Sequence, residues 1–213
     1  MKTYTSFVCT ILESYKDRLQ IIPVLYDNKI IGILSPVTRL YKIANPEYVS
    51  LICKWREENP IGFANSFKGT EQKTEYWLDK ILLPRKDRIL FMIYTLNFKP
   101  VGHLGFSNFD FENKSCEIDN VVRGVKEGNA GIMTQAIKTL IIWAKRDLKI
   151  KHIYLKVLKD NFHAIKFYEK IGFTQQYNIP LFENRKEGLI EWIEMENPEN
   201  RKPDRFYICM KLF

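Results

Sequence analysis

The segment from Gly131 to Leu148 constrains the fold most, because its apolar residues follow a helical period between two strand-length runs. Residues three and four positions apart share one face of a helix. The residues at this spacing are Met133, Ala136, Ile137, Leu140, Ile141 and Ala144. The flanking runs at 115–122 and 152–158 are short and apolar, which favours strands. A helix that joins two strands in this order predicts a crossover within one sheet.

Three strand-length runs with short turns form the middle of the chain. They lie at 88–95, 100–106 and 115–122, a spacing typical of an antiparallel meander. The other predicted elements are a short strand at 39–43, helices at 46–58, 70–83 and 161–171, and strands at 173–177 and 205–212. A meander followed by a strand-helix-strand unit predicts an α/β fold of the α+β mixed-sheet type, with helices on both faces.

Residues 1–36 are predicted to form an N-terminal extension, and residues 37–213 the main domain. Within the extension, apolar runs at 20–26 and 29–34 flank Asp27-Asn28, which indicates a β-hairpin. This hairpin is a candidate for an added strand or for pairing in a homodimer. The connection between 177 and 205 is predicted to be irregular, with a short amphipathic helix near 188–195.

The composition indicates a folded protein of the cytoplasm. A chain of 213 residues with 46% hydrophobic residues suits one domain with a full core. Its four cysteines are widely separated, as expected in a reducing compartment, and we expect neither a signal peptide nor a membrane-spanning segment. The three histidines have no metal-ligand spacing, so we expect no metal site.

The formal net charge of +8 leaves three interpretations open. A solvated surface is the default, a phosphate-bearing ligand comes next, and nucleic acid comes third. Because the basic residues are spread along the chain and not clustered, we expect no nucleic-acid partner and no membrane partner.

A glycine-rich loop precedes the helix that begins near Gly131. Residues 122–133 contain three glycines, together with Arg123 and Lys126. The first N–H groups of a helix have no partner within the helix, and glycines let a phosphate approach them closely. The loop is therefore a candidate anion site, although a basic surface loop would have the same composition.

A second segment carries a closer resemblance. Asn161-Phe162-His163-Ala164-Ile165-Lys166-Phe167-Tyr168-Glu169-Lys170-Ile171-Gly172-Phe173 resembles the N-x-x-A-I-x-x-Y-E-K-x-G-F signature of GCN5-related (GNAT) acetyltransferases. The stretch from Gly131 to Lys138 is similar to the family's G-[ILY]-[GAM]-T-E-A-L-K stretch. The subgroup that the chain resembles most contains the ribosomal-protein alanine acetyltransferases and the nucleotide-amino-sugar acetyltransferases.

The cofactor loop departs from the family pattern [QR]-x-x-G-x-[GA]. Gly128 stands at the Gln/Arg position, and Met133 stands at the second glycine. Arg123 or Lys126 is a candidate replacement for the missing charge.

The resemblance implies that acetyl-CoA is the acyl donor and that it lies in a V-shaped split between the strands at 116–122 and 152–158. Its pantetheine arm would pair with the backbone near Val121 and Val122. Asn161, Ala164 and Phe167 would lie on the other side of the arm. The implied pyrophosphate contacts are Arg123, Gly128, Asn129, Ala130, Gly131, Ile132 and Met133.

The resemblance also implies two catalytic side chains. Tyr168 would protonate the leaving thiolate, whereas helical spacing alone also fits a core aromatic residue. Glu117 would remove a proton from the ammonium group of the acceptor through a water molecule. Asp119 points to the same side of its strand, so it is an alternative base.

The acceptor is expected to be a small-molecule primary amine that carries phosphate, with a nucleotide-linked amino sugar as the first interpretation. Its walls are expected in the loop 59–69 and in the segment 180–203, both of which contain aromatic residues. The alternatives are the amino terminus of a ribosomal or other protein, a polyamine or aminoglycoside, and a non-catalytic acyl-CoA-binding module.

Overall fold

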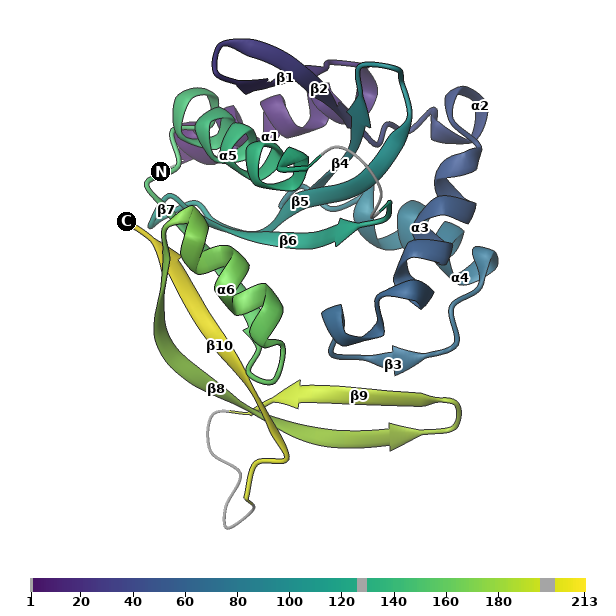
Figure 1. The fold of residues 1–213 in the computed structure, drawn as a ribbon, viewed down its shortest axis with the longest axis vertical. Coiled ribbons are helices and arrows are strands. Elements are labelled where there is room, and N and C mark those ends of the chain that lie inside the picture. The colour runs from purple at the N-terminus through teal and green to yellow at the C-terminus, as the bar shows by residue number, and fades with distance from the viewer. Residues whose placement is uncertain (1, 126–129, 196–201) are drawn as a thin grey trace.

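The structure, a computed structural model, describes residues 2–125, 130–195 and 202–213. Its strands form one ten-stranded sheet (Figure 1). In spatial order the strands are β1 (Ile22–Tyr26), β2 (Lys29–Pro36), β4 (Ile89–Thr95), β5 (Pro100–Asp110), β6 (Ser115–Arg123), β7 (His152–Leu158), β10 (Arg205–Leu212), β8 (Phe173–Lys186), β9 (Leu189–Glu194) and β3 (Ser66–Phe67). Neighbouring strands are antiparallel except β6 and β7, which are parallel.

Helices cover both faces of the sheet, which confirms the predicted mixed α/β fold. One face carries α1 (Lys2–Asp17), α5 (Ile132–Asp147) and α6 (Phe162–Ile171). The other carries α3 (Glu47–Glu58), α4 (Glu71–Trp77) and the π-helical turn η2 (Leu78–Leu82), with the short elements α2 (Tyr41–Ala44) and η1 (Pro60–Gly62) beside them. None of the helices in the described residues is long and apolar enough to span a bilayer.

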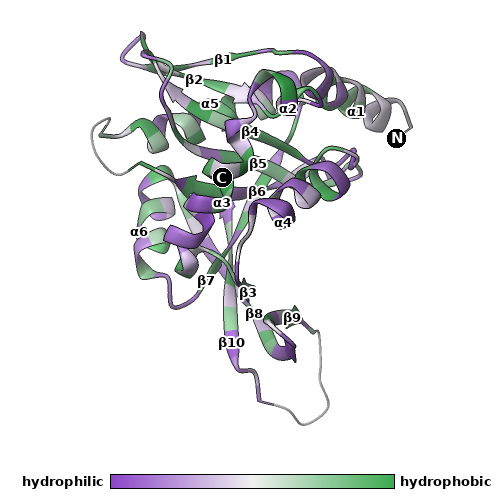
Figure 2. Cartoon of the chain, turned by 90° about the vertical axis from the view of Figure 1, so that its right-hand side faces the viewer, coloured by the Kyte–Doolittle hydropathy of each residue, from purple (hydrophilic) through white to green (hydrophobic). Residues whose placement is uncertain are grey.

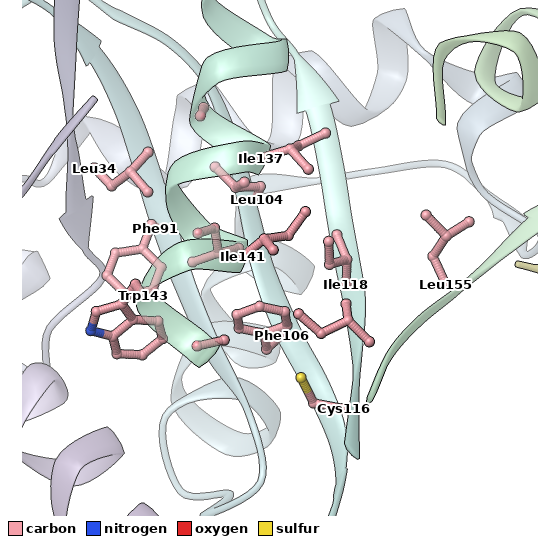
Figure 3. Close-up of a cluster of buried hydrophobic side chains, with 14 of the residues drawn as sticks. Leu34, Phe91, Leu104, Phe106, Cys116, Ile118, Ile137, Ile141, Trp143 and Leu155 are labelled. Atoms are coloured by element: carbon pink, nitrogen blue, oxygen red, sulfur yellow. The ribbon is translucent and has the colours of Figure 1, made fainter. Parts of the chain in front are cut away.

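The larger core lies beneath α5, as the helical period of its sequence predicts. Figure 3 shows Ile137, Ile141 and Trp143 of α5 together with Phe91, Leu104 and Phe106 of the central strands. The indole of Trp143 is 1% exposed and contacts the rings of Phe91 and Phe106. Burying large apolar side chains from a helix and three strands in one place stabilises the strand order from which the site is built.

A second core fills the space between the sheet and α3, α4 and η2. It is built from Tyr48, Ile52 and Trp55 of α3, Leu78 and Leu82 of η2, and Leu90, Met92 and Tyr94 of β4. Every residue of β4 is buried because helices cover both of its faces. Figure 2 shows the hydrophobic residues gathered on the central strands, between helices whose outer sides are hydrophilic.

The N-terminal residues contribute to the larger core. The runs around Asp27-Asn28 form the strands β1 and β2, and β2 pairs with β4. Helix α1, which the sequence did not suggest, places Val8 and Leu12 in the core. The hydroxyl oxygen of its Tyr15 accepts a 3.0 Å hydrogen bond from the indole N–H of Trp143 in α5.

Two local predictions were wrong. Residues 39–43 were expected to be a strand, but Tyr41–Ala44 is a helical turn whose buried Tyr41 packs into the second core. Residues 188–195 were expected to be a short helix, but 189–194 is strand β9, which pairs with an extended β8 around Gly188. The apolar residues of this segment come in adjacent pairs separated by a glutamate, which does not distinguish a strand from a helix, and the pairing with β8 and β3 favours the strand.

Candidate active site

The parallel strands β6 and β7 pair over only part of their length. The paired residues are Ser115 with His152, Cys116 with Ile153, and Glu117 with Tyr154. Beyond this point β6 stays paired with β5, and β7 stays paired with β10 as far as Leu158. Because each strand follows its outer neighbour, the two diverge and form the V-shaped split that was predicted.

A β-bulge lies in the diverging part of β6. His103 of β5 pairs with Val122 and Gly105 pairs with Asp119, so two residues of β6 face one residue of β5. Asn120, one of these two, has a φ of +53°. Such a bulge bends the strand and increases its twist, which moves the end of β6 away from β7.

A cleft of about 300 Å³ occupies the split. Its walls come from β6, β7, α6, the loop after α3, and the ends of β9 and β10. Of the residues predicted from the sequence, it is lined by Glu117, Val121, Asn161, Ala164 and Tyr168. Side chains from two strands and one helix, far apart in sequence, thus meet at one opening.

Tyr168 lies at the inner wall of the cleft and is 9% exposed. Its ring packs against Phe167 and Phe173, with centroids 5.4 Å and 6.0 Å away. Burial, and secondarily the charge of Asp119, raises the pKa of Tyr168 well above its ordinary value. The phenol therefore stays protonated at neutral pH and is available as a hydrogen-bond donor.

Glu117 lies on the opposite wall, where two neighbours hold its carboxylate. Asn108 donates a hydrogen bond to Oε2 at 3.1 Å, and the Nζ of Lys156 lies 3.8 Å from Oε1. Lys156 also forms an ion pair with Glu194 at 2.9 Å. Burial lowers the pKa of Lys156, but its contacts with Glu194 and Glu117 outweigh burial and raise it, so the ammonium group stays charged.

Asp119, the alternative base, is held differently. Its Oδ1 accepts a hydrogen bond from the N–H of Asn120 at 2.7 Å, and its Oδ2 lies 3.8 Å from the guanidinium of Arg88. Both carboxylates line the cleft. Asp119 thus has a backbone donor that fixes it to the bulge, whereas Glu117 is held by side chains alone.

Asn161 has a structural contact at each end of its carboxamide. Its oxygen accepts from the N–H of Ala164 and caps α6, and its Nδ2 donates to the carbonyl of Ile61 at 3.3 Å. A primary amide has two N–H donors, so one is left for a ligand. Asn161 therefore ties α6 to the loop after α3, a role that the sequence motif did not suggest.

The remaining predicted cofactor residues lie away from the walls of this cleft. Ile132, Met133 and Phe167 pack against the larger core, and Val122 belongs to the second core. Arg123 lies at the exposed end of β6, where its Nε donates to the carbonyl of Val125. Gly128 and Asn129 lie outside the described residues, and the exposed Ala130 is followed by Gly131.

Gly131 begins α5 in a conformation that suits an open helix end. Its φ is +83°, and the helix has no side-chain cap there. A Cβ at this position would meet nothing within 4 Å. The first N–H groups of α5 therefore have no side-chain cap from Gly131.

Several cleft residues were missed from the sequence: Arg88, Lys156, Glu194 and Tyr207. Lys156 lies on β7 two positions from Leu158 in an otherwise apolar strand. A charged residue inside such a run was the available signal. Glu194 had none, because its segment was predicted to be irregular or helical. Tyr207 lies in the strand predicted at 205–212, and nothing in the sequence of that strand placed it beside the cleft.

Gly124 lies where α3 packs against the end of β6. A Cβ there would overlap the indole ring of Trp55, which is 2% exposed. We expect Gly124→Ala to lower the free energy of unfolding by about 1–3 kcal/mol, because the helix or the strand end must move. Urea unfolding followed by circular dichroism measures this. Gly62→Ala is the control, because a Cβ at Gly62 meets nothing within 4 Å; equal losses in both variants would contradict the packing argument.

The sequence also matches a known protein family. Residues 67–173, half of the chain, match the Acetyltransferase (GNAT) family. The chain belongs to this family. It is an N-acetyltransferase that uses acetyl-CoA as its acyl donor.

Individual relatives of this GNAT chain extend the comparison. It is 30% identical over 148 residues to an N-acetyltransferase 9-like protein of Caenorhabditis elegans, covering 61% of this chain and 72% of that protein. The RimL ribosomal L7/L12 alpha-N-protein acetyltransferase superposes with a TM-score of 0.63 and 19% identity. The match covers 91% of this chain and 93% of that chain. Spermidine N-acetyltransferase from Vibrio cholerae, in complex with CoA and spermine, superposes with a TM-score of 0.60 and 14% identity. The match covers 79% of this chain and 90% of that chain. At these identities the two structures show the shared fold alone.

Proposed function

We propose that this GNAT chain acetylates a primary amine in the cleft between β6 and β7, with Tyr168 as general acid and Glu117 as general base. The observation that carries the proposal is that both side chains line one cleft at the point where the two strands diverge. Acetyl-CoA supplies a thioester that an amine attacks and from which a thiolate leaves. The chain has to position the two reactants and move two protons.

The fit of the donor rests on two features of the cleft. Beyond Glu117, β6 has no pairing with β7, so backbone groups near Val121 are available to an extended ligand. The open start of α5 at Gly131 offers N–H groups to a phosphate. Val121, Ala164 and Asn161 would hold the arm, and residues 130–133 the pyrophosphate.

The proposed proton transfers follow from the two walls. An amine reaches the site as an ammonium ion and must lose a proton before it can attack. Glu117, oriented by Asn108 and Lys156, accepts this proton through a water molecule. Tyr168 stays protonated because it is buried, and its hydroxyl donates to the sulfur as negative charge develops there.

Glu117→Gln is expected to lower kcat/KM about a hundredfold, because the amide keeps the shape and the contact with Asn108 but no longer accepts a proton. Initial rates of thiol release across the pH range measure this, and the loss should be greatest at neutral pH and shrink at alkaline pH, where the amine deprotonates in solution. Asp119→Asn is the matched variant on the same strand. A larger loss in Asp119→Asn would transfer the role of base to that residue.

The proposed acceptor is a nucleotide-linked amino sugar. Two cationic side chains without carboxylate partners beside the cleft, described below, support an acceptor that carries phosphate. The amino terminus of a protein or a polyamine is the second candidate, favoured by the three carboxylates of Glu117, Asp119 and Glu194 in the cleft. The RimL protein is a ribosomal L7/L12 alpha-N-protein acetyltransferase, and the Vibrio cholerae enzyme is a spermidine N-acetyltransferase bound to spermine. Three further points stay predictions. They are membership of the subgroup that contains the ribosomal-protein alanine and nucleotide-amino-sugar acetyltransferases, a homodimer, and a cytoplasmic location.

A thiol-release assay with acetyl-CoA tests the function directly. The acceptor panel contains UDP-glucosamine, a dTDP-linked amino sugar, peptides with a free amino terminus, and spermidine. We expect turnover with the nucleotide-linked amines above that with the others. No thiol release with any amine would contradict the proposed transfer. Turnover with peptides alone would show that the acceptor is a protein amino terminus and not an amino sugar.

A further inference from the structure

A second, smaller cavity of about 120 Å³ lies beneath α3 and α4, on the side of the sheet opposite to α5. The residues that matter for its chemistry are Arg56, Phe63, Lys73, Trp77, His103 and Asn120. Its volume is comparable with that of an engineered cavity that holds one benzene ring. A group the size of one ring fits inside it, and the rest of a larger ligand would lie outside it.

His103 gives this cavity a hydrogen-bond acceptor. The side chain is 1% exposed, and its Nδ1 lies 2.7 Å from the carbonyl oxygen of Asn120. A carbonyl oxygen only accepts, so Nδ1 carries the proton and Nε2 has a lone pair. Nε2 is buried and has no partner within the described residues. Burial lowers the pKa of His103 to about 4, so the ring is neutral at physiological pH.

Arg56 and Lys73 give the cavity a positive charge. The guanidinium of Arg56 lies between the rings of Phe63 and Phe67, 4.2 Å and 4.3 Å from their centroids, and donates to the carbonyl of Asn65. The Nζ of Lys73 lies 5.1 Å from the centroid of Phe67 and donates to the carbonyl of Lys68.

Neither of these two cations forms an ion pair in the described part of the chain, although the nearby charge of Glu57 acts on Arg56. Across residues 2–125, 130–195 and 202–213, no ion pair joins either of them to a carboxylate. The neighbouring carboxylate of Glu57 accepts from the N–H of Gly69 at 2.8 Å. Two cations that contact aromatic rings and carbonyl groups without forming an ion pair among the described residues, one of them half-buried, suit an anionic ligand.

The cavity adjoins the active-site cleft. Phe63 and Asn120 line both spaces, and the carbonyl of Asn120 holds His103. Asn120 belongs to the bulge of β6, so one backbone irregularity connects the reaction site to the cavity. An acceptor whose amine lies near Glu117 can extend past Phe63 into this space.

We propose that this cavity is the acceptor subsite, in which His103 accepts a hydrogen bond from a sugar hydroxyl and Lys73 and Arg56 bind the phosphate of the same molecule. The inference rests on the proposed function, because it places the amine of that acceptor in the cleft. Trp77 and Phe63 offer apolar faces to the sugar ring. The ligand class is a phosphorylated amino sugar.

The test measures binding, so that it does not depend on turnover. Calorimetry on the CoA-loaded protein gives the Kd of UDP-glucosamine and of UDP. We expect Lys73→Gln to raise both Kd values about tenfold at low salt, because both ligands carry the phosphate. We expect His103→Phe to raise the Kd of UDP-glucosamine about threefold to tenfold and to leave that of UDP unchanged. Lys80→Gln, an exposed change in the neighbouring π-helical turn, should match the wild type.

Three results would overturn the subsite. The first is that the wild type does not bind UDP-glucosamine. The second is that the wild type and Lys73→Gln bind it with the same Kd. The third is that Lys73→Gln raises the KM of a peptide amine and of no other acceptor. If His103→Phe does not fold, the exposed Lys73→Gln still decides the phosphate contact. The proposed transfer fails separately, when acetyl-CoA binds but no amine in the panel releases thiol. Tight binding of UDP-glucosamine in that case would support the subsite without the reaction.

Discussion

Tyr168→Phe is expected to lower kcat by about a hundredfold to ten-thousandfold, the range that one general acid typically contributes. The hydroxyl is the only group removed, and Tyr168 lines the cleft at the divergence of β6 and β7. The Kd of CoA should change little, because the ring keeps its contacts with Phe167 and Phe173. Steady-state thiol release and calorimetry with CoA give the two quantities.

Tyr207→Phe is the matched control for this prediction. Tyr207 is a second phenol that lines the same cleft, but it comes from β10 on the side of Glu194. Its loss should change kcat by no more than a few-fold. A large loss of kcat in Tyr207→Phe, with an unchanged kcat in Tyr168→Phe, would assign the role of general acid to Tyr207. A large rise in the Kd of CoA in Tyr168→Phe would assign that residue to binding.

Trp143→Ala should have the largest effect on stability, about 3–5 kcal/mol in the free energy of unfolding. The indole is 1% exposed and packs edge-on against Tyr15 and Phe91 and stacks on Phe106. Its removal leaves a cavity between α1, α5 and the sheet. It also removes the 3.0 Å hydrogen bond between the indole N–H and the hydroxyl of Tyr15. Urea unfolding followed by circular dichroism measures the change.

Ile142→Ala on the same helix is the control. Ile142 precedes Trp143 but faces outward and is 60% exposed, so its loss should change the free energy of unfolding by less than about 0.5 kcal/mol. Similar effects of the two changes would mean that α5 is not packed in the orientation described.

The parts of the fold that were predicted correctly are those with a strong local period. The apolar face of 131–148 and the runs 152–158 and 205–212 were placed well, because each repeats its pattern over several turns or alternations. Helix α1 was missed although its buried residues Val8 and Leu12 lie four positions apart, as on one face of a helix. Strand β9 was assigned to a helix because a six-residue segment fits both periods.

The residues of the candidate site also fall into those that a local sequence pattern reveals and those that it does not. The motif from Asn161 to Phe173 is contiguous, so the sequence alone pointed to the family and to Tyr168. Lys156, Glu194 and Tyr207 belong to three strands, and His103 belongs to a fourth. Their meeting depends on strand order and on the bulge at Asn120, and neither is encoded in any short segment.

The amino-acid order by itself determined the class of fold and the acetyl donor and led to the proposal of Tyr168 as the acid, because these follow from local periods and from a short contiguous motif. The tertiary structure alone decided where the strands part, which carboxylate is held by Lys156, and that a neutral histidine shares a cavity with two cations. The physical reason is that pairing and burial act between residues far apart in the chain, so charge and hydrogen-bond partners are assigned only when the sheet forms.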